Sequence, residues 1–439
     1  MNHKSSIKNL LYLSIPIFIA NLALPLVAIV DTGLMGNLDN ASYLTATSIA
    51  TSLFSLIFWS FGFLRMGTVG IVSQAHGAGR YNEIIDLFFR NITFVILISL
   101  VLILLKNFIF NLSLQIFNLS NDTEQYFKNY FYIRIYSSLG ELTIYVITGL
   151  FIGLQKTLTS SIVVTFFSIT NIICSLFFVL YIDLNVVGVA LGTLVASTLT
   201  AVIFIVHTFN ELKKITSINF KFKQIYNIKK IQNIFNINFN IFIRTVLLTF
   251  SFLFFTYLGN RISENVVAAN TILINLIFLS AFILDAYAIS TEGIVGHSIG
   301  SKNIILLRQV IKNSFILSAS TGLIISILYF FIKNHFISWM TDLPEIKTIS
   351  LLYSYWVIII PLISSFCYQF DGIFVGASQT KELRNAMIIS VCVYILSATY
   401  LISNFANSGL WLSFAIFFIV RALTLLFYLN RVYEKILKY

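Results

Sequence analysis

The residues that could carry chemistry in this chain are charged side chains set inside long apolar stretches. Asp31 lies in "LVAIVDTGLMG", Leu26 to Gly36, within an apolar run that begins near Leu10. No basic residue occurs between Lys8 and the end of that run. A carboxylate without a partner in a low-dielectric site can take up and release a proton near neutral pH. We therefore expect Asp31 to be a proton-binding group.

Eight further ionisable residues lie within apolar stretches: Arg65, Arg134, Glu141, Arg244, Asp285, Glu292, Asp371 and Arg421. A charge near mid-membrane costs about 2.5 to 3.5 kcal/mol on insertion scales, so such residues usually face water or a partner. Arg134 and Glu141 are seven residues apart, two turns along one helix face, and form a candidate charge pair. Arg65 and Asp285 form a second candidate pair between helices. Glu292 is expected at the inner water boundary, as a helix-end residue.

Proline residues mark a candidate hinge close to Asp31. Pro25 lies six residues before Asp31, and Pro16 lies nearer the start of the same run. A proline inside a helix removes one backbone hydrogen bond and clashes with the carbonyl four residues earlier. Pro25 is therefore a hinge candidate, although prolines within membrane helices are also common as plain kinks.

The elements that position these residues are apolar helices. With 58% hydrophobic and 10% charged residues, the chain differs from soluble domains, which are about 25% charged. A membrane-spanning helix needs about 20 apolar residues. Twelve such stretches occur, at about 10–34, 45–72, 88–110, 127–152, 159–181, 187–208, 235–258, 266–292, 312–333, 350–375, 386–403 and 408–429. The sequence therefore predicts an all-α integral membrane protein with twelve transmembrane helices.

Motifs of enzymes and metal sites do not occur in the sequence. The five histidines show no HExxH spacing, the three cysteines lie inside the predicted spans, and there is no GxxxxGK[ST] phosphate-binding loop. A membrane-embedded acyltransferase or glycosyltransferase would need an acid and base pair at a water interface, and no such pair is recognised. We therefore expect no enzyme, no cofactor and no metal site.

The net charge of +11 follows the predicted topology rather than a nucleic-acid surface. With the N-terminus placed in the cytoplasm, nineteen Lys and Arg residues fall in inner segments and five in outer segments. Such an excess predicts that both termini are cytoplasmic, by the positive-inside rule. Nucleic acid is not an expected partner.

An internal repeat divides the chain in half. At one offset of 223 residues, "TVGIVSQAHG" aligns with "TEGIVGHSIG", "TGLFIGLQKT" with "DGIFVGASQT", and "LMGN" with "YLGN". Each half carries six predicted spans, so the halves should be related by a parallel repeat, a plan found among transporters. The expected organisation is an N-terminal six-helix lobe at 1–210, a basic cytoplasmic linker at 211–232 and a C-terminal six-helix lobe at 233–439.

Five motifs follow one another along the chain: "DTGLMG" in span 1, "HGAGRYNEI" after span 2, "GLQKT" after span 4, "NVVGVALGT" into span 6 and "FDGIFVGASQTKELRNAM" around span 10. In their order and spacing they resemble the multidrug and toxic compound extrusion (MATE) transporters, and within them the DinF-like branch. The resemblance covers nearly all of the chain and implies an antiporter that expels cationic, amphipathic compounds in exchange for H⁺ or Na⁺.

The resemblance also implies site residues in the N-terminal lobe. Asp31 matches the span 1 carboxylate that binds the proton or cation. Asn171 and Thr193 match polar positions of the same cluster, whereas Ser175 stands where members of the family often carry an aspartate. That departure puts a relay of two carboxylates in doubt.

In the C-terminal lobe, Asp371 matches a family carboxylate in span 10. Span 7 carries Arg244 and no acidic residue, at the place where sodium-coupled members have one. A Na⁺ site needs several oxygen ligands held together, so this loss favours H⁺ over Na⁺.

The expected function is a secondary active antiporter that exports amphipathic, cationic compounds in exchange for protons, with protonation of Asp31 driving bending of span 1 at Pro25. The alternative is a flippase for a lipid-linked saccharide or another amphipathic lipid. The expected partners are a small amphipathic substrate, H⁺ and membrane lipid. The expected form is a monomer in the bacterial cytoplasmic (inner) membrane.

Overall fold

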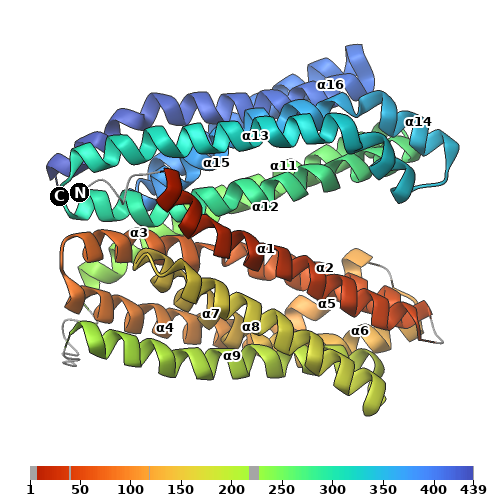
Figure 1. Cartoon of the computed structure of the whole chain (residues 1–439). Helices are drawn as coiled ribbons and strands as arrows, with labels where there is room; N and C mark the ends of the chain where they lie inside the picture. The colour runs from red at the N-terminus through yellow and green to blue at the C-terminus, as the bar shows by residue number, and fades with distance from the viewer. Residues whose placement is uncertain (1–6, 39–40, 118, 217–226, 439) are drawn as a thin grey trace. The chain divides into compact units, whose positions relative to one another are not determined.

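The computed structural model describes residues 7–38, 41–117, 119–216 and 227–438, and within these ranges every regular element is a helix (Figure 1). The helices before residue 217 are α1 (Ile7–Gly36), α2 (Ala41–Ser60), α3 (Phe63–Gly77), α4 (Tyr81–Leu104), α5 (Lys106–Phe117), α6 (Asn121–Arg134), η1 (Ile135–Ser137), α7 (Ser138–Gly153), α8 (Thr157–Leu176), η2 (Phe177–Tyr181) and α9 (Asn185–Ile215). The helices after residue 226 are α11 (Ile228–Ile262), α12 (Glu264–Gly300), α13 (Ile304–Met340), α14 (Pro344–Tyr353), α15 (Tyr355–Gly376) and α16 (Thr380–Lys438).

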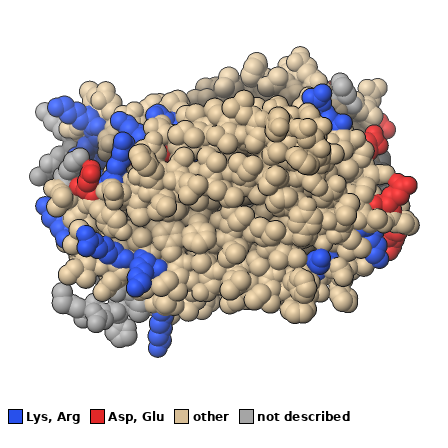
Figure 2. Space-filling view, turned by 90° about the horizontal axis from the view of Figure 1, so that it is seen from above, with Lys and Arg blue, Asp and Glu red and all other residues tan. Residues whose placement is uncertain are grey.

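Eleven helical segments of the described chain are long and apolar enough to cross a membrane. On the face drawn in Figure 2, charged side chains gather toward the helix ends, and other residues form the band between them. Exposed Leu, Ile and Phe side chains on these helices suit a lipid solvent, because hydrocarbon carries no penalty for apolar surface. The protein is therefore a multi-pass membrane protein.

The last of these segments, α16, is interrupted. A straight helix of its 59 residues would be about 90 Å long, roughly three times the hydrocarbon thickness. Ala406 has a non-helical backbone, with φ 46° and ψ −125°, and a Cβ added to Gly409 would lie 2.1 Å from the carbonyl oxygen of Leu401. The chain therefore turns back on itself here. This break, between the predicted spans 386–403 and 408–429, accounts for the difference between eleven continuous segments and twelve predicted spans.

The chain forms two compact units. We call Ile19–Phe235 the first unit, and Met1–Phe18 with Asn236–Tyr439 the second unit. The division falls inside α1, whose first turns pack on α12 of the second unit: the hydroxyl oxygens of Ser14 and Ser290 are 2.8 Å apart. The predicted N-terminal lobe included these turns. Residues 217–226 of the predicted linker lie outside the described residues.

The turns of the two halves repeat the same backbone conformation. Three pairs of residues with positive φ are separated by the offset of the sequence motifs, 223 residues: Gly79 and Lys302, Gln155 and Ser378, Asp183 and Ala406. Glycine adopts positive φ readily, whereas other residues do so rarely. The internal repeat is therefore present in the backbone conformation of these turns, even where the side chains differ. The break at Ala406 thus corresponds to the turn between α8 and α9.

Close packing of glycine on backbone recurs at the same offset. In "GLFIG" of α7, a Cβ added to Gly149 would lie 2.6 Å from the carbonyl oxygen of Arg65 in α3. In "GIFVG" of α15, a Cβ added to Gly372 would lie 2.4 Å from the carbonyl oxygen of Ala288 in α12. Small residues let membrane helices approach closely, and packing then replaces the hydrophobic driving force that lipid cannot supply. Each unit is therefore built around one such helix pair.

These contacts predict a clear difference between two glycine substitutions. Gly372→Ala should destabilise the protein by about 1 to 3 kcal/mol, because the added methyl group has no room beside a backbone carbonyl. Gly33→Ala is the matched control, since a Cβ at Gly33 would meet nothing within 4 Å. Thermal unfolding of the purified protein in detergent, followed by size-exclusion chromatography, measures both. Equal melting temperatures for the two variants would contradict this packing.

Candidate functional site

The first unit gathers polar side chains around Asp31. The Asp31 side chain is 7% exposed, and its carboxyl group forms a side-chain hydrogen bond with Ser175 of α8. The amide nitrogen of Asn171 donates to the hydroxyl oxygen of Thr193 in α9 at 2.9 Å, and the Ser175 hydroxyl is 3.5 Å from the amide oxygen of Asn171. The structure therefore brings three predicted site residues, Asp31, Asn171 and Thr193, into one buried cluster with Ser175.

Local sequence explains why α8 and α9 meet at this cluster. A Cβ added to Gly192 would lie 2.6 Å from the Ser175 hydroxyl oxygen and 2.8 Å from the Ser175 backbone nitrogen. Only glycine allows α9 to pass so close to Ser175. Thr193, the next residue, consequently reaches Asn171 across the same interface.

One oxygen of Asp31 stands apart from this network. Among the described residues, its Oδ1 is buried without a hydrogen-bond partner. A buried polar atom without a partner costs about 1 to 3 kcal/mol, and more when it is charged. The cluster therefore leaves one carboxylate oxygen able to receive a proton or a donor group.

A second group of charges lies beside this cluster. The guanidinium of Arg134, at the end of α6, pairs with the Glu141 carboxylate of α7 and donates to the Ser137 hydroxyl. The Ser137 hydroxyl also donates to Glu141 at 2.9 Å. The rings of Phe54 and Phe58 lie 5.2 and 5.1 Å from the guanidinium carbon, within cation-π range. The candidate pair predicted two turns apart is thus an ion pair here.

Arg134 also acts on the charge of Asp31, and both act on the buried phenol of Tyr130. The sequence indicated that no basic residue lies between Lys8 and the end of the span of Asp31, and this holds for α1 beyond its first turn. The structure adds a basic group from another helix. Asp31 therefore lies in the field of a guanidinium whose direct partner is a different carboxylate.

Asp371 has a different environment in the second unit. Its Oδ2 accepts from the guanidinium groups of both Arg244 in α11 and Arg421 in α16. All three residues are at most 9% exposed. Paired charges are the usual way to keep ionised groups out of water. The predicted role of Asp371 in binding a proton or cation stays a prediction, because this carboxylate already has two cationic partners.

The remaining predicted residues are placed as follows. Arg65 and Asp285 belong to different units, so the predicted pair between them stays a prediction. In its own unit Arg65 acts on Tyr145, and Asp285 acts on Tyr368. Pro25 lies inside α1, which is one continuous helix, so its role as a hinge also stays a prediction.

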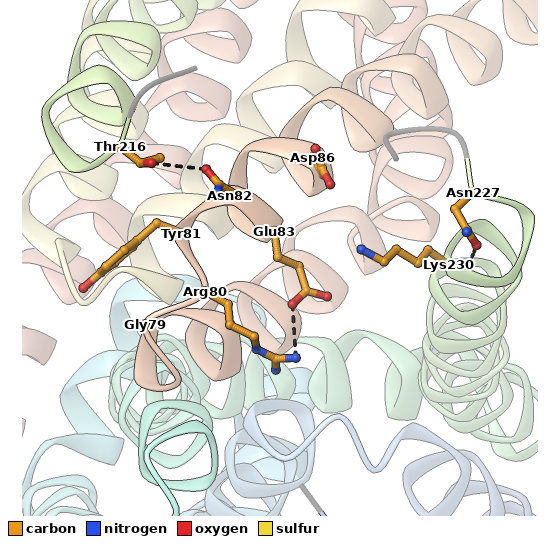
Figure 3. A pocket seen from close by; sticks show the side chains of 9 residues that line it. All are labelled: Gly79, Arg80, Tyr81, Asn82, Glu83, Asp86, Thr216, Asn227 and Lys230. Carbon is orange, nitrogen blue, oxygen red and sulfur yellow. Dashed lines mark hydrogen bonds and ion pairs between the residues drawn. The ribbon is translucent and has the colours of Figure 1, made fainter. Parts of the chain in front are cut away.

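A polar pocket of about 500 Å³ lies elsewhere in the first unit (Figure 3). It is built on the turn between α3 and α4, within the motif "HGAGRYNEI", and its lining residues are Gly79, Arg80, Tyr81, Asn82, Glu83, Asp86, Thr216, Asn227 and Lys230. Arg80 pairs with Glu83 at 3.3 Å, and Thr216 is hydrogen-bonded to Asn82 at 3.1 Å. Asp86 pairs with Arg90, which lies outside the lining. None of the lining residues belongs to the Asp31 or Asp371 groups.

Sequence reasoning missed three residues that contribute to the Asp31 and Asp371 groups. Ser175 was noted only as a lost aspartate, whereas its hydroxyl contacts Asp31. Arg421 was listed among the ionisable residues within apolar stretches but was assigned to no pair, whereas it binds Asp371. Tyr130 gave no signal, because nothing along the chain separates it from the many other aromatic residues.

Comparison with known proteins settles the family. A family model described as MatE matches residues 16–177 and again residues 241–402, two segments of equal length that follow the internal repeat. The chain belongs to the MatE family. The resemblance to MATE transporters that the motifs indicated is thereby confirmed.

Two relatives show how far the MATE likeness extends. The chain is 28% identical over 423 residues to DNA damage-inducible protein F of Escherichia coli (strain K12). The aligned region covers 96% of this chain and 91% of that protein. It is 23% identical over 257 residues to Multidrug export protein MepA of Staphylococcus aureus (strain bovine RF122 / ET3-1), covering 58% and 56% of the two chains.

Solved structures of MATE proteins share the fold. A MOP superfamily transporter from Pyrococcus furiosus superposes with a TM-score of 0.87 at 15% identity, covering 98% of this chain and 96% of that chain. The Vibrio cholerae MATE transporter VcmN in the bent form superposes with a TM-score of 0.85 at 18% identity. The superposition covers 98% of this chain and 97% of that chain. The predicted all-α, two-lobe membrane fold is confirmed.

The arginine pair around Asp371 predicts an order of stability among variants. Asp371→Asn should lower the free energy of unfolding by about 3 to 5 kcal/mol, because it leaves two buried guanidinium groups without their carboxylate. Arg421→Gln should cost less, since Asp371 keeps Arg244. Thermal unfolding in detergent gives the comparison. A variant Asp371→Asn as stable as the unmodified protein would mean that the carboxylate has no structural role.

Proposed function

We propose that this MATE protein is a proton-coupled antiporter that exports amphipathic, cationic compounds, and that Asp31 is its proton-binding group. The proposal draws on relatives whose names describe export: MepA is a multidrug export protein, and a solved structure with a TM-score of 0.87 is described as a multidrug resistance MATE family transporter. The choice of Asp31 as the coupling residue rests on the contacts of this chain itself.

The observation that carries the proposal is the contrast between two buried carboxylates. Asp371 is held by two arginines, so protonating it would remove the negative charge that balances both guanidinium groups. Asp31 has one hydroxyl partner and, among the described residues, no direct ion pair, whereas the Oδ1 atoms of both carboxylates lack a hydrogen-bond partner there. Protonation of Asp31 therefore removes a buried charge and breaks no direct ion pair. Of the two, Asp31 is suited to change its charge during transport.

The same cluster favours a proton over a sodium ion. Na⁺ and similar hard cations need several oxygen ligands directed at one point. Here the side chains of Asn171, Ser175 and Thr193 bond to one another, and α11 contributes no Asp or Glu. A proton needs one free carboxylate oxygen, which Asp31 provides.

The coupling step we propose is a change in α1 near Pro25. A proton moving inward across a 100 mV potential contributes about 2.3 kcal/mol, which shifts a two-state equilibrium by roughly fiftyfold. The backbone carbonyl four residues before Pro25 has no helical donor, so the helix is easier to deform there. Two solved MATE structures with TM-scores of 0.87 and 0.88 are described as straight and bent conformations. The ends of α1 also belong to different compact units.

For the cellular setting, we propose a monomer in the bacterial cytoplasmic (inner) membrane with both termini in the cytoplasm. The bacterial relatives and the excess of basic residues in the inner segments support this.

The Asp31 proposal is tested by Asp31→Asn, which keeps the side chain's shape and fixes it as neutral. In proteoliposomes with an imposed pH gradient, we expect it to insert and fold but to lose efflux of a cationic dye, because no proton can bind. Asp122→Asn, at the exposed start of α6, is the matched control and should transport normally. Efflux is normalised to folded protein. Normal efflux by Asp31→Asn would reject the proposal.

The choice of coupling ion is tested separately, with the unmodified protein. We expect a pH step at fixed Na⁺ to drive dye efflux, and an imposed Na⁺ gradient at fixed pH to drive none. Efflux that follows the Na⁺ gradient and ignores the pH step would contradict proton coupling.

A further inference from the structure

The interior of the first unit contains two carboxylates, Asp31 and Glu141, and one guanidinium, that of Arg134, whose charge acts on both. Arg134 pairs directly with Glu141, and its charge also acts on Asp31. Asp31 retains a buried oxygen with no hydrogen-bond partner among the described residues. A guanidinium has five N–H donors, and a carboxylate oxygen without a partner is the acceptor it prefers. Arg134 therefore has a second acceptor close to the one it uses.

The site that Arg134 now fills is built for a planar cation. The rings of Phe54 and Phe58 stack 5.9 Å apart with an interplanar angle of 25°, and both lie within 5.2 Å of the guanidinium carbon. Glu141 supplies the opposite charge, and Ser137 supplies a hydroxyl. Ring faces attract delocalised cations most strongly where water is excluded. We call Phe54, Phe58, Ser137 and Glu141 the cation cage.

We propose that Arg134 exchanges between Glu141 and Asp31, so that the cation cage opens to a planar organic cation only when Asp31 is ionised. In the state described here, Arg134 occupies the cage. When it moves to the ionised Asp31, the cage is left with an unpaired Glu141 and two ring faces, which bind the cation. When Asp31 takes up a proton, Arg134 returns to Glu141 and expels the cation.

Charge counting shows why this exchange makes the two ligands exclude each other. A proton on Asp31 and a monovalent cation in the cage each add one positive charge to the same buried group of Asp31, Glu141 and Arg134. Binding both would add two positive charges to one buried group, which costs more than binding either ligand alone. Antiport requires such mutual exclusion, because the protein must not carry both ligands together.

Two tyrosines and one further arginine lie around this exchange. Tyr130 forms a side-chain hydrogen bond with Arg134 and also senses the Asp31 charge. Tyr145 faces the charges of Glu141, Arg65 and Arg134. Arg65 therefore adds a constant positive charge.

This inference rests on the proposed function and differs from it in one respect. The proposed function makes Asp31 the proton-binding group. The inference assigns cation binding to the cation cage. It makes Arg134 a positioning residue whose partner depends on whether Asp31 is protonated. The two can therefore fail separately.

The test is equilibrium binding of ethidium, a planar cation, to purified protein in detergent. We expect Asp31→Asn to weaken binding by about tenfold or more, because Arg134 then stays in the cage. Adding Arg134→Gln to Asp31→Asn should restore the affinity at a pH where Glu141 is ionised. Glu141→Gln alone should abolish binding. The matched control is Asp31→Asn with Arg421→Gln, which removes a buried arginine from the second unit and should restore nothing.

A double variant Asp31→Asn, Arg134→Gln that is folded but binds as weakly as Asp31→Asn would overturn the inference. Should the glutamine variant fail to fold, Arg134→Met keeps the apolar stem between the two rings and serves in its place. If neither folds, Glu141→Gln decides alone: ethidium binding equal to that of the unmodified protein refutes the cage. Normal pH-driven efflux by Asp31→Asn would instead reject the proposed function.

Discussion

The cost of keeping a charge away from water governs the interior of this protein. Each buried ionised group must find a partner, change its charge or stay in contact with water. The second unit takes the first course, with two arginines on Asp371. The first unit pairs Arg134 with Glu141 and, among the described residues, leaves Asp31 without a direct ion pair. The same physical rule thus has opposite results in the two units: the charge of Asp371 is fixed, and the charge of Asp31 is able to change.

Around these charges, the helices are held by close packing rather than by water-driven burial. Gly149 and Gly372 set their helices directly against backbone carbonyls, at positions one repeat apart. Gly192 does the same beside Ser175, and there the packing interface is also part of the polar cluster. Scaffold and site therefore share residues in the first unit. A change that loosens α8 from α9 would also move the hydroxyl that contacts Asp31.

Much of the fold could be predicted from the sequence, because span length, loop charge and the glycine-rich repeat are local signals. The break at Ala406 was visible as a gap between two apolar runs. The partners of the charges were less accessible, because they come from helices distant in sequence. Arg134 and Glu141 could be paired by helical spacing, but the pairing of Arg244 and Arg421 with Asp371 depends on three helices packing together. The division of α1 between two units gave no sequence signal.

The repeated turns bear on how such a protein can change over time. Lys302 holds the same left-handed conformation as Gly79, so the two halves share this backbone conformation with different residues. The intramembrane carboxylates have not been kept in this way: one repeat away, Asp31 corresponds to Phe254 and Asp371 to Thr148. A duplicated framework with independent interiors lets one half acquire or lose a reactive group while the other maintains the architecture. Specialisation of a single half is then a small evolutionary step.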